Sequence, residues 1–235
     1  MIHRRELTQK SIGSAQRCYN QLRRPKKCLV LLSGGVDSTT LAFWLKDQGF
    51  AIEALYFDYG QGKTNGERTC AMAIARKLDI TLHAVETPLP SDVIRNALTV
   101  QDSCIQVDDA KIFGDVIGMC TTAMTLAFIH GFDSISLGIN ADNARVHPSL
   151  SNGFFETIGE LASIWKGRRI VVLTPFLQKS KTSIMRVGAD IGVPYAETWS
   201  CGASIEKQCG KCAECKARKA AFKGAKLPDP TDYET

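Results

Sequence analysis

Short apolar segments alternate with longer amphipathic stretches along the whole chain. Runs of six or seven residues rich in Val, Ile, Leu and aromatic side chains predict strands over 28–33, 52–58, 80–86, 134–140 and 169–175. Helices are predicted between them, over 37–48, 65–78, 115–130, 153–165 and 180–191. Strands that alternate with helices indicate βαβ units. We therefore expect an α/β fold with an open parallel sheet that has helices on both faces.

Composition is that of an ordinary globular protein. The 235 residues are 44% hydrophobic and 23% charged, which suffices for one sizeable core. The N-terminus lacks the apolar core of a secretory signal, and no apolar run approaches the roughly 18 residues that a membrane span needs. We expect a cytoplasmic protein without a membrane partner.

Positive charge is concentrated at the N-terminus. The whole chain carries a net charge of +5, residues 1–27 contribute +7, and the remainder is therefore −2. A single acid, Glu6, stands there against eight basic residues: Arg4, Arg5, Lys10, Arg17, Arg23, Arg24, Lys26 and Lys27. We interpret 1–27 as a basic extension, which is a solvated arm, a contact for nucleic acid or an acidic partner, or a transit peptide.

The nine cysteines fall into two groups, and without an export signal they argue against a disulfide framework. Five are scattered, several of them among apolar neighbours where a thiol acts as a small hydrophobe: Cys18, Cys28, Cys70, Cys104 and Cys120. The other four form a C-x7-C-x2-C-x2-C cluster: Cys201, Cys209, Cys212 and Cys215. Four thiolates at this spacing suit tetrahedral Zn²⁺ in a closed structural site, so we predict a small zinc-binding module over 199–226.

Ligands of an open parallel sheet bind beyond the carboxyl ends of its strands. The first such end carries the sequence LSGGVDST, which covers Leu32, Ser33, Gly34, Gly35, Val36, Asp37, Ser38 and Thr39. Adjacent glycines permit close backbone approach, and amides at the start of a helix bind anions. The hydroxyls would add donors for phosphate oxygens, and Asp37 would hold Mg²⁺ or cap the helix. The same residues also suit a plain tight turn with an N-cap.

The string S-G-G-x-D-S-T after a first strand resembles the pyrophosphate-binding loop of the adenine nucleotide alpha hydrolase-like enzymes, or PP-loop ATP pyrophosphatases. This resemblance implies cleavage of ATP between the α and β phosphates. A substrate oxygen attacks the α phosphorus, and a nitrogen or sulfur nucleophile then displaces AMP from the adenylate. It also implies that residues 33–39 hold the pyrophosphate end, that Asp37 supports Mg²⁺, and that 28–198 form the ATP-binding domain.

A second candidate contact follows the second predicted strand, in the sequence FDYGQ over 57–61. The resembled family places adenine beside this strand end, where backbone groups and an aromatic ring can read the base. Tyr59 and Gln61 are therefore candidate adenine contacts, although a Tyr-Gly turn needs no ligand to form.

Motifs at both ends together resemble the 7-cyano-7-deazaguanine synthases of queuosine precursor synthesis. The matching stretches are LSGGVDSTT, KSKTSIMRVGADIGVPYAETWSC and CGKCAECKAR, and the resemblance extends over residues 28 to about 223. It implies an ATP-dependent ligase that adenylates the carboxylate of 7-carboxy-7-deazaguanine, forms the amide with ammonia, and activates it again to give the nitrile. The implied catalytic set is Ser33, Asp37, Ser38 and Lys181, and homodimers are common in the family. Lys181 would neutralise phosphate charge, with a solvated lysine as the alternative.

The middle of the chain departs from that family. Asp115 and Val116 stand where the synthases carry Arg and Asn, and Ser149, Leu150 and Ser151 stand where they carry Asp-Cys-Arg. An Arg can pair with a carboxylate or phosphate, and an Asp can read a guanine-like edge. The changes therefore fall where the substrate should be recognised.

Two explanations compete for these changes. A divergent synthase would have rebuilt its substrate contacts from residues after the fourth strand: Asn140, Asp142, Asn143, Arg145 and His147. A paralogue would instead activate another carboxylate, or join a deazaguanine acid to a different amine such as a protein, as relatives near antiphage defence genes are thought to do. His147 is either a general base or a loop histidine. A PP-loop enzyme acting on RNA and a non-catalytic nucleotide- or nucleic-acid-binding module are further alternatives, although we expect a small-molecule substrate rather than nucleic acid.

Overall fold

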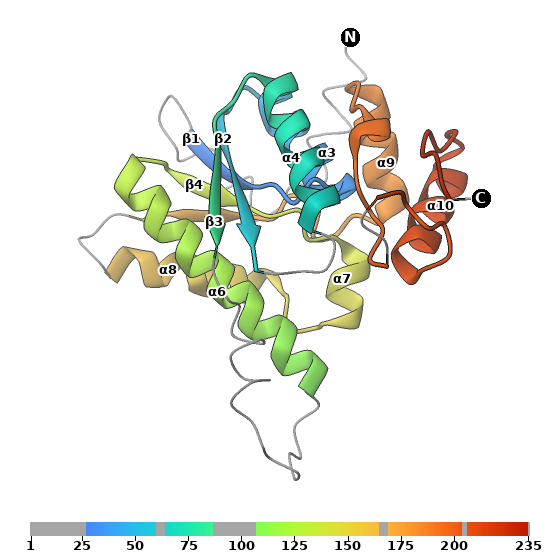
Figure 1. The fold of residues 1–235 in the computed structure, drawn as a ribbon. Helices are drawn as coiled ribbons and strands as arrows, with labels where there is room; N and C mark the ends of the chain where they lie inside the picture. The colour runs from blue at the N-terminus through green and yellow to red at the C-terminus, as the bar shows by residue number, and fades with distance from the viewer. Residues whose placement is uncertain (1–26, 60–63, 87–106, 165–168, 204–205, 235) are drawn as a thin grey trace, which may run out of the picture.

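The computed structural model of the chain describes residues 27–59, 64–86, 107–164, 169–203 and 206–234. A five-stranded parallel sheet in the order β3-β2-β1-β4-β5 forms its centre (Figure 1). The strands are β1 (Lys27–Leu31), β2 (Ala51–Asp58), β3 (Leu82–Glu86), β4 (Ser134–Ser136) and β5 (Val171–Leu173). The predicted α/β class is confirmed.

Seven α-helices and one 3₁₀ helix surround the sheet in the described residues. They are α3 (Val36–Asp47), α4 (Thr64–Leu78), α6 (Val107–His130), α7 (Ala141–Val146), α8 (Asn152–Ile164), α9 (Lys181–Asp190), η1 (Tyr195–Glu197) and α10 (Ala213–Ala225). Helices α9 and α10 lie side by side at one end of the sheet, with α10 and the four-cysteine segment on the outside (Figure 1).

Alternation of side chains along the central strand gives the sheet its two covered faces. Cys28, Val30 and Leu32 pack in one core with residues of α3, α4 and α9, whereas Leu29 and Leu31 pack in a second core with α6 and α8. A strand buried on both faces needs an unbroken apolar run rather than an alternating one. This is why β1 reads as a continuous hydrophobic segment in the sequence.

The observed elements differ from the predicted ones in the second half of the chain. The fourth strand ends at Ser136, because the chain then turns and brings Gly138 against the start of α3. Helix α6 begins at Val107 rather than at residue 115. Helices α7 and α10 were not predicted, because their segments were interpreted as candidate substrate contacts and as a zinc-binding module and not as helices.

Some predictions fall outside the described residues. These are the basic extension apart from Lys27, the adenine candidate Gln61, and the scattered cysteines Cys18 and Cys104. Among the helices that the structure describes, none is both long and apolar enough to cross a membrane.

Candidate active site

The candidate site lies where the strand order reverses. Strands β2 and β3 extend the sheet on one side of β1, and β4 and β5 extend it on the other. In sheets of this order, ligands usually bind beyond the carboxyl ends of the strands at this point. Gly138, which follows β4, lies so close to α3 that a Cβ on it would stand 3.0 Å from the amide nitrogen of Ser38.

Two glycines shape the loop between β1 and α3. Gly34 has φ +78°, and a Cβ there would lie 2.5 Å from the carbonyl oxygen of Glu67 and 2.9 Å from the amide nitrogen of Ala71. Only glycine satisfies both the left-handed conformation and this close approach to α4. Gly35 is the N-cap of α3 and has no side chain to cap it. The first amides of α3 are thus left without a side-chain cap, as a phosphate-binding helix start requires.

The loop hydroxyls form a small network of their own. The Ser33 and Ser38 oxygens are 3.0 Å apart, the Ser33 amide donates to Ser38 Oγ (3.2 Å), and Ser38 Oγ donates to the Gly35 carbonyl oxygen (3.2 Å). The Gly35 amide donates to Ser33 Oγ at 3.3 Å. These contacts hold residues 33–38 in a single compact turn around the start of α3.

Asp37 of α3 and Lys181 of α9 form an ion pair at the candidate site. Lys181 Nζ lies 2.9 Å from Asp37 Oδ2, and the two side chains are 24% and 18% exposed. The other carboxylate oxygen, Oδ1, and the Thr39 hydroxyl are buried and have no hydrogen-bond partner among the described residues. Buried polar atoms are nearly always paired, so these two atoms are suited to a cation or a ligand group.

The segment after β4 brings a second acid to the same place. Asn140 caps α7 by accepting from the amides of Asp142 and Asn143, which completes a capping box. Asp142 Oδ2 accepts from the backbone amide of Lys181 at 3.2 Å, and its Oδ1 pairs with Arg145. The candidate substrate residues thereby contact the helix that carries the candidate catalytic lysine.

Other candidates lie at the edges of this arrangement. Tyr59 directly follows β2, and its ring packs against the core formed with α6 and α8. His147 ends α7, where its amide donates to the Asn143 carbonyl oxygen. Val116 and Leu150 are buried in the α6–α8 core, so these two departures from the resembled family serve packing.

The four clustered cysteines converge at the C-terminal end of the chain. Their sulfur atoms all lie within 4.8 Å of one another, although the residues span 201–215. Five backbone amides donate to these sulfurs at 3.3–3.4 Å, those of Ala203, Cys209, Lys211, Cys212 and Cys215. The amides of Lys211 and Cys212 lower the pKa of Cys209 to about 6. Burial raises the pKa of Cys215, so it is the convergence of the four sulfur atoms that fits a closed four-sulfur metal site.

The remaining described cysteines are poor nucleophiles. Burial raises the pKa of both Cys28 and Cys120 to about 12, and that of Cys70 to about 11. Cys28 and Cys120 are fully buried in the two cores, as the sequence predicted.

Sequence reasoning missed the residues that anchor the cysteine module to the sheet. Arg218 of α10 is fully buried and donates to the Tyr195 carbonyl oxygen (2.7 Å), the Thr198 hydroxyl (2.7 Å) and Asp229 Oδ1 (3.2 Å). Trp199 lies against Gly66 of α4, and its amide donates to the Gly34 carbonyl oxygen in the loop between β1 and α3. The only feature of the sequence that could have indicated Trp199 is a large apolar side chain between two polar residues, Thr198 and Ser200.

Known proteins resemble the chain over nearly its whole length. Residues 27–226 match the sequence profile of the family described as queuosine biosynthesis protein QueC. The 7-cyano-7-deazaguanine synthase of Methanoculleus marisnigri is 36% identical over 223 residues, which cover 89% of this chain and 99% of that protein. The synthase of Aromatoleum aromaticum is 34% identical and covers 89% of this chain and 98% of its own length.

Solved structures show the same fold at low sequence identity. The U34-tRNA thiolase NcsA from Methanococcus maripaludis superposes with a TM-score of 0.54 at 14% identity and covers 92% of this chain and 70% of its own. The NMN synthetase from Francisella tularensis also has a TM-score of 0.54, at 15% identity, and covers 98% and 97% of the two chains. These similarities concern the fold alone.

Proposed function

Because the chain belongs to the family of queuosine biosynthesis protein QueC, we propose that it is a 7-cyano-7-deazaguanine synthase. In the first half-reaction, a carboxylate oxygen of 7-carboxy-7-deazaguanine attacks the α phosphorus of ATP, which releases pyrophosphate and forms an acyl adenylate. Ammonia displaces AMP and leaves the amide. A second ATP activates the amide oxygen in the same way and releases pyrophosphate, and loss of AMP and of both amide protons gives the nitrile.

The unpaired buried oxygens of the phosphate loop carry this proposal. Asp37 Oδ1 and Thr39 Oγ1 lack a partner among the described residues and lie at the uncapped start of α3. A loop that served only as a turn would bond these atoms internally, as it bonds Ser33 to Ser38. Free hydroxyl, carboxylate and amide groups at one helix start suit a triphosphate with its magnesium ion.

We assign each loop group a task in the transfer. The α3 amides and the hydroxyls of Ser33, Ser38 and Thr39 bind the pyrophosphate that leaves. Asp37 Oδ1 is the candidate ligand for Mg²⁺, which would neutralise phosphate charge when bound. Lys181, held 2.9 Å from Asp37 Oδ2, is placed to stabilise the negative charge that develops between the α and β phosphates. Tyr59 and Gln61 are the proposed adenine contacts.

We propose Zn²⁺ for the four-cysteine site, with a structural role. All four positions of a tetrahedral ion would be filled by sulfur, which leaves none open for substrate. The seven described cysteines are free thiols, which suits a protein that works in the reducing cytoplasm.

A second candidate function rests on the exposed α7 segment. None of the α7 residues is buried, and Arg145 is 75% exposed, although substrate recognition is expected there. A paralogue that accepts another carboxylate, or another amine, would need its altered contacts at this position.

One incubation separates these functions. We expect protein, ATP, Mg²⁺, 7-carboxy-7-deazaguanine and ammonium to yield AMP with the amide and the nitrile, identified by mass spectrometry. AMP without either product would indicate the paralogue. No AMP with this acid or with other carboxylates would rule out the enzymatic proposal.

A further inference from the structure

The segment 198–201 runs directly from the phosphate loop to the four-cysteine site. At one end, the backbone amide of Trp199 donates to the Gly34 carbonyl oxygen at 2.9 Å. At the other, the indole Nε1 of the same residue donates to the carbonyl oxygen of Cys201 at 2.8 Å. One residue therefore hydrogen-bonds to both sites.

The bond to Gly34 fixes the peptide plane that carries the Gly35 amide, at the start of the loop proposed to bind phosphate. In a trans peptide the carbonyl and the following amide point in opposite directions. Holding the Gly34 oxygen against Trp199 thus directs the Gly35 amide away from Trp199, and it donates to Ser33 Oγ at 3.3 Å. The orientation of this peptide plane decides whether the loop presents its amides to an anion.

The indole ring is confined as tightly as its backbone. Trp199 is 9% exposed and packs with Cys201, Cys215 and Cys70. A Cβ added to Gly66 of α4 would stand 2.6 Å from the ring atoms Cδ2 and Cε2, so the helix surface and the ring are in direct contact. The ring cannot tilt without moving either α4 or the Cys201 carbonyl.

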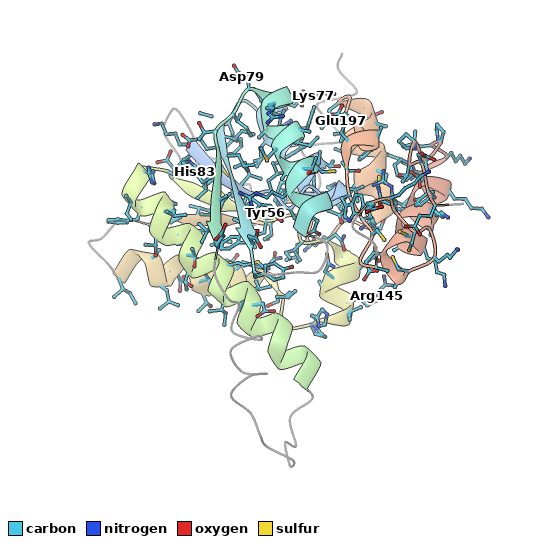
Figure 2. The ribbon with its side chains drawn as sticks, viewed as in Figure 1. Tyr56, Lys77, Asp79, His83, Arg145 and Glu197 are labelled. Atoms are coloured by element: carbon cyan, nitrogen blue, oxygen red, sulfur yellow. The ribbon has the colours of Figure 1, made fainter. Side chains whose placement is uncertain are left out.

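Neighbouring bonds hold the segment from outside. Figure 2 shows Lys77 of α4 and Glu197 of η1 pointing toward one another, and they form an ion pair. The buried guanidinium of Arg218 donates to the hydroxyl of Thr198 at 2.7 Å. Because these bonds hold the segment on either side of Trp199, we expect a shift of Cys201 to move Trp199 and, through it, the Gly34 peptide.

We propose that Trp199 is a positioning residue that couples metal binding at the four-cysteine site to nucleotide binding at the phosphate loop. A metal ion fixes the Cys201 sulfur and with it the Cys201 carbonyl, which orients the indole and the Gly34 peptide. Coupling between two binding sites is reciprocal, so the nucleotide strengthens metal binding by the factor by which the metal strengthens nucleotide binding. This inference rests on the proposed function, because it requires ATP at the loop.

The test compares zinc affinity with and without nucleotide in the full chain. Zinc-loaded protein is equilibrated with a chromogenic chelator, either without nucleotide or with saturating ATP and excess Mg²⁺, and ATP binding is measured separately by calorimetry. We expect ATP to raise the apparent zinc affinity of the wild type about fivefold or more. The ratio to compare is the zinc affinity with ATP divided by the zinc affinity without ATP. Trp199→Phe, which keeps a ring but loses the indole donor, should bring this ratio close to one.

Two further variants distinguish a specific loss of coupling from a general loss of structure. Gly66→Ala displaces the indole although alanine is the better helix former, so it should also lower the ratio without weakening α4 itself. Trp44→Phe removes a tryptophan that packs edge-on to Phe176 at 6.0 Å in a different core, and it should keep the wild-type ratio. A purely structural role of Trp199 would change zinc affinity equally with and without ATP and leave the ratio intact.

Two outcomes overturn different statements. If ATP does not bind the zinc-loaded wild type, the proposed function fails. If ATP binds but the zinc affinity of the wild type is unchanged by it, or if Trp199→Phe retains the full ratio, the coupling inference is wrong and the proposed function stands.

Discussion

The candidate site has two sides, the loop wall after β1 and the α7 wall after β4, and they are built from different groups. The loop wall, residues 33–39, is formed by backbone and short hydroxyls, and its left-handed Gly34 is pressed against the backbone of α4. The α7 wall, residues 140–147, consists of the six-residue helix α7 and its two caps; no residue within the helix is buried, whereas the N-cap Asn140 is. The loop wall is tied to the cysteine module through Trp199, whereas the α7 wall is held by the Asn140 cap and by one carboxylate bond to Lys181.

Under the proposed function, the loop wall determines how a substrate is activated and the α7 wall determines which substrate is accepted. Geometry set by glycine and buried bonds tolerates little change, because almost any side chain at Gly34 would meet backbone atoms. Exposed side chains on α7 can be exchanged at small cost in stability. We therefore expect the proposed phosphate chemistry to tolerate fewer substitutions than the proposed substrate contacts at Asp142 and Arg145.

The largest predicted effect concerns the anchor of the loop wall. Arg218 is fully buried, and its charge is balanced by Asp229 and by four oxygens of the 195–200 segment. Arg218→Met should lower the free energy of unfolding by about 3–5 kcal/mol, because it breaks the ion pair with Asp229 and removes the buried hydrogen bonds that the guanidinium donates to the 195–200 segment. Urea unfolding of the zinc-loaded protein measures this, with the exposed Lys216→Met of the same helix as control. Equal stability of the two variants would contradict a buried anchor.

A loss of chemistry should follow from changing the loop acid. Asp37→Ala should reduce AMP formation about 10²- to 10³-fold, the usual effect of removing a preorganised charged group, while ATP still binds measurably. Ser33→Ala should act in the same direction. Asp47→Ala, at the exposed far end of α3, is the matched control and should keep its rate. AMP formation by Asp37→Ala at nearly the wild-type rate would refute the loop assignment.

The pH dependence of the free energy of unfolding tests the Arg218–Asp229 pair with a smaller expected effect. Burial raises the pKa of Asp229, but hydrogen bonds from Tyr233 and Thr231 and the charge of Arg218 outweigh it and leave the pKa below its usual value. A carboxyl with a depressed folded pKa stabilises the protein above its unfolded pKa of about 3.9, and this contribution is lost as the pH falls through the folded pKa.

Asp229→Asn should therefore be less stable than wild type at pH 7, by about 1.5 kcal/mol. The difference between the two proteins should shrink as urea unfolding is repeated toward pH 3, and metal loss at low pH affects both alike. Asp232→Asn, whose acid is exposed, should show no such convergence. A constant difference at every pH would contradict the lowered pKa.

Local patterns explain what could be predicted from the sequence. The glycine pair after β1 and the cysteine spacing each specify a turn or a site within a few residues, so both were found. The anchors join residues far apart in the chain, Arg218 to Tyr195 and Trp199 to Gly34 and Gly66. A Trp or Arg in a polar stretch carries no local sign of its partner. Helix α7 was missed because its signal, Asn140 with Asn143 three residues later, was interpreted as substrate chemistry instead of a capping box.

The smallest predicted effect concerns the exposed end of the α7 wall. Arg145 lies on α7 at the outer side of the molecule (Figure 2), is 75% exposed and pairs with Asp142. An exposed ion pair is worth about 0–1 kcal/mol, so Arg145→Ala should raise the KM for the carboxylate at most about fivefold and leave kcat, the KM for ATP and the melting temperature unchanged. Arg145→Lys should restore most of the affinity, because it keeps the charge that a carboxylate would meet. A tenfold loss of kcat in Arg145→Ala would show that the α7 wall takes part in the transfer itself, and the division between an activating wall and a selecting wall would then fail.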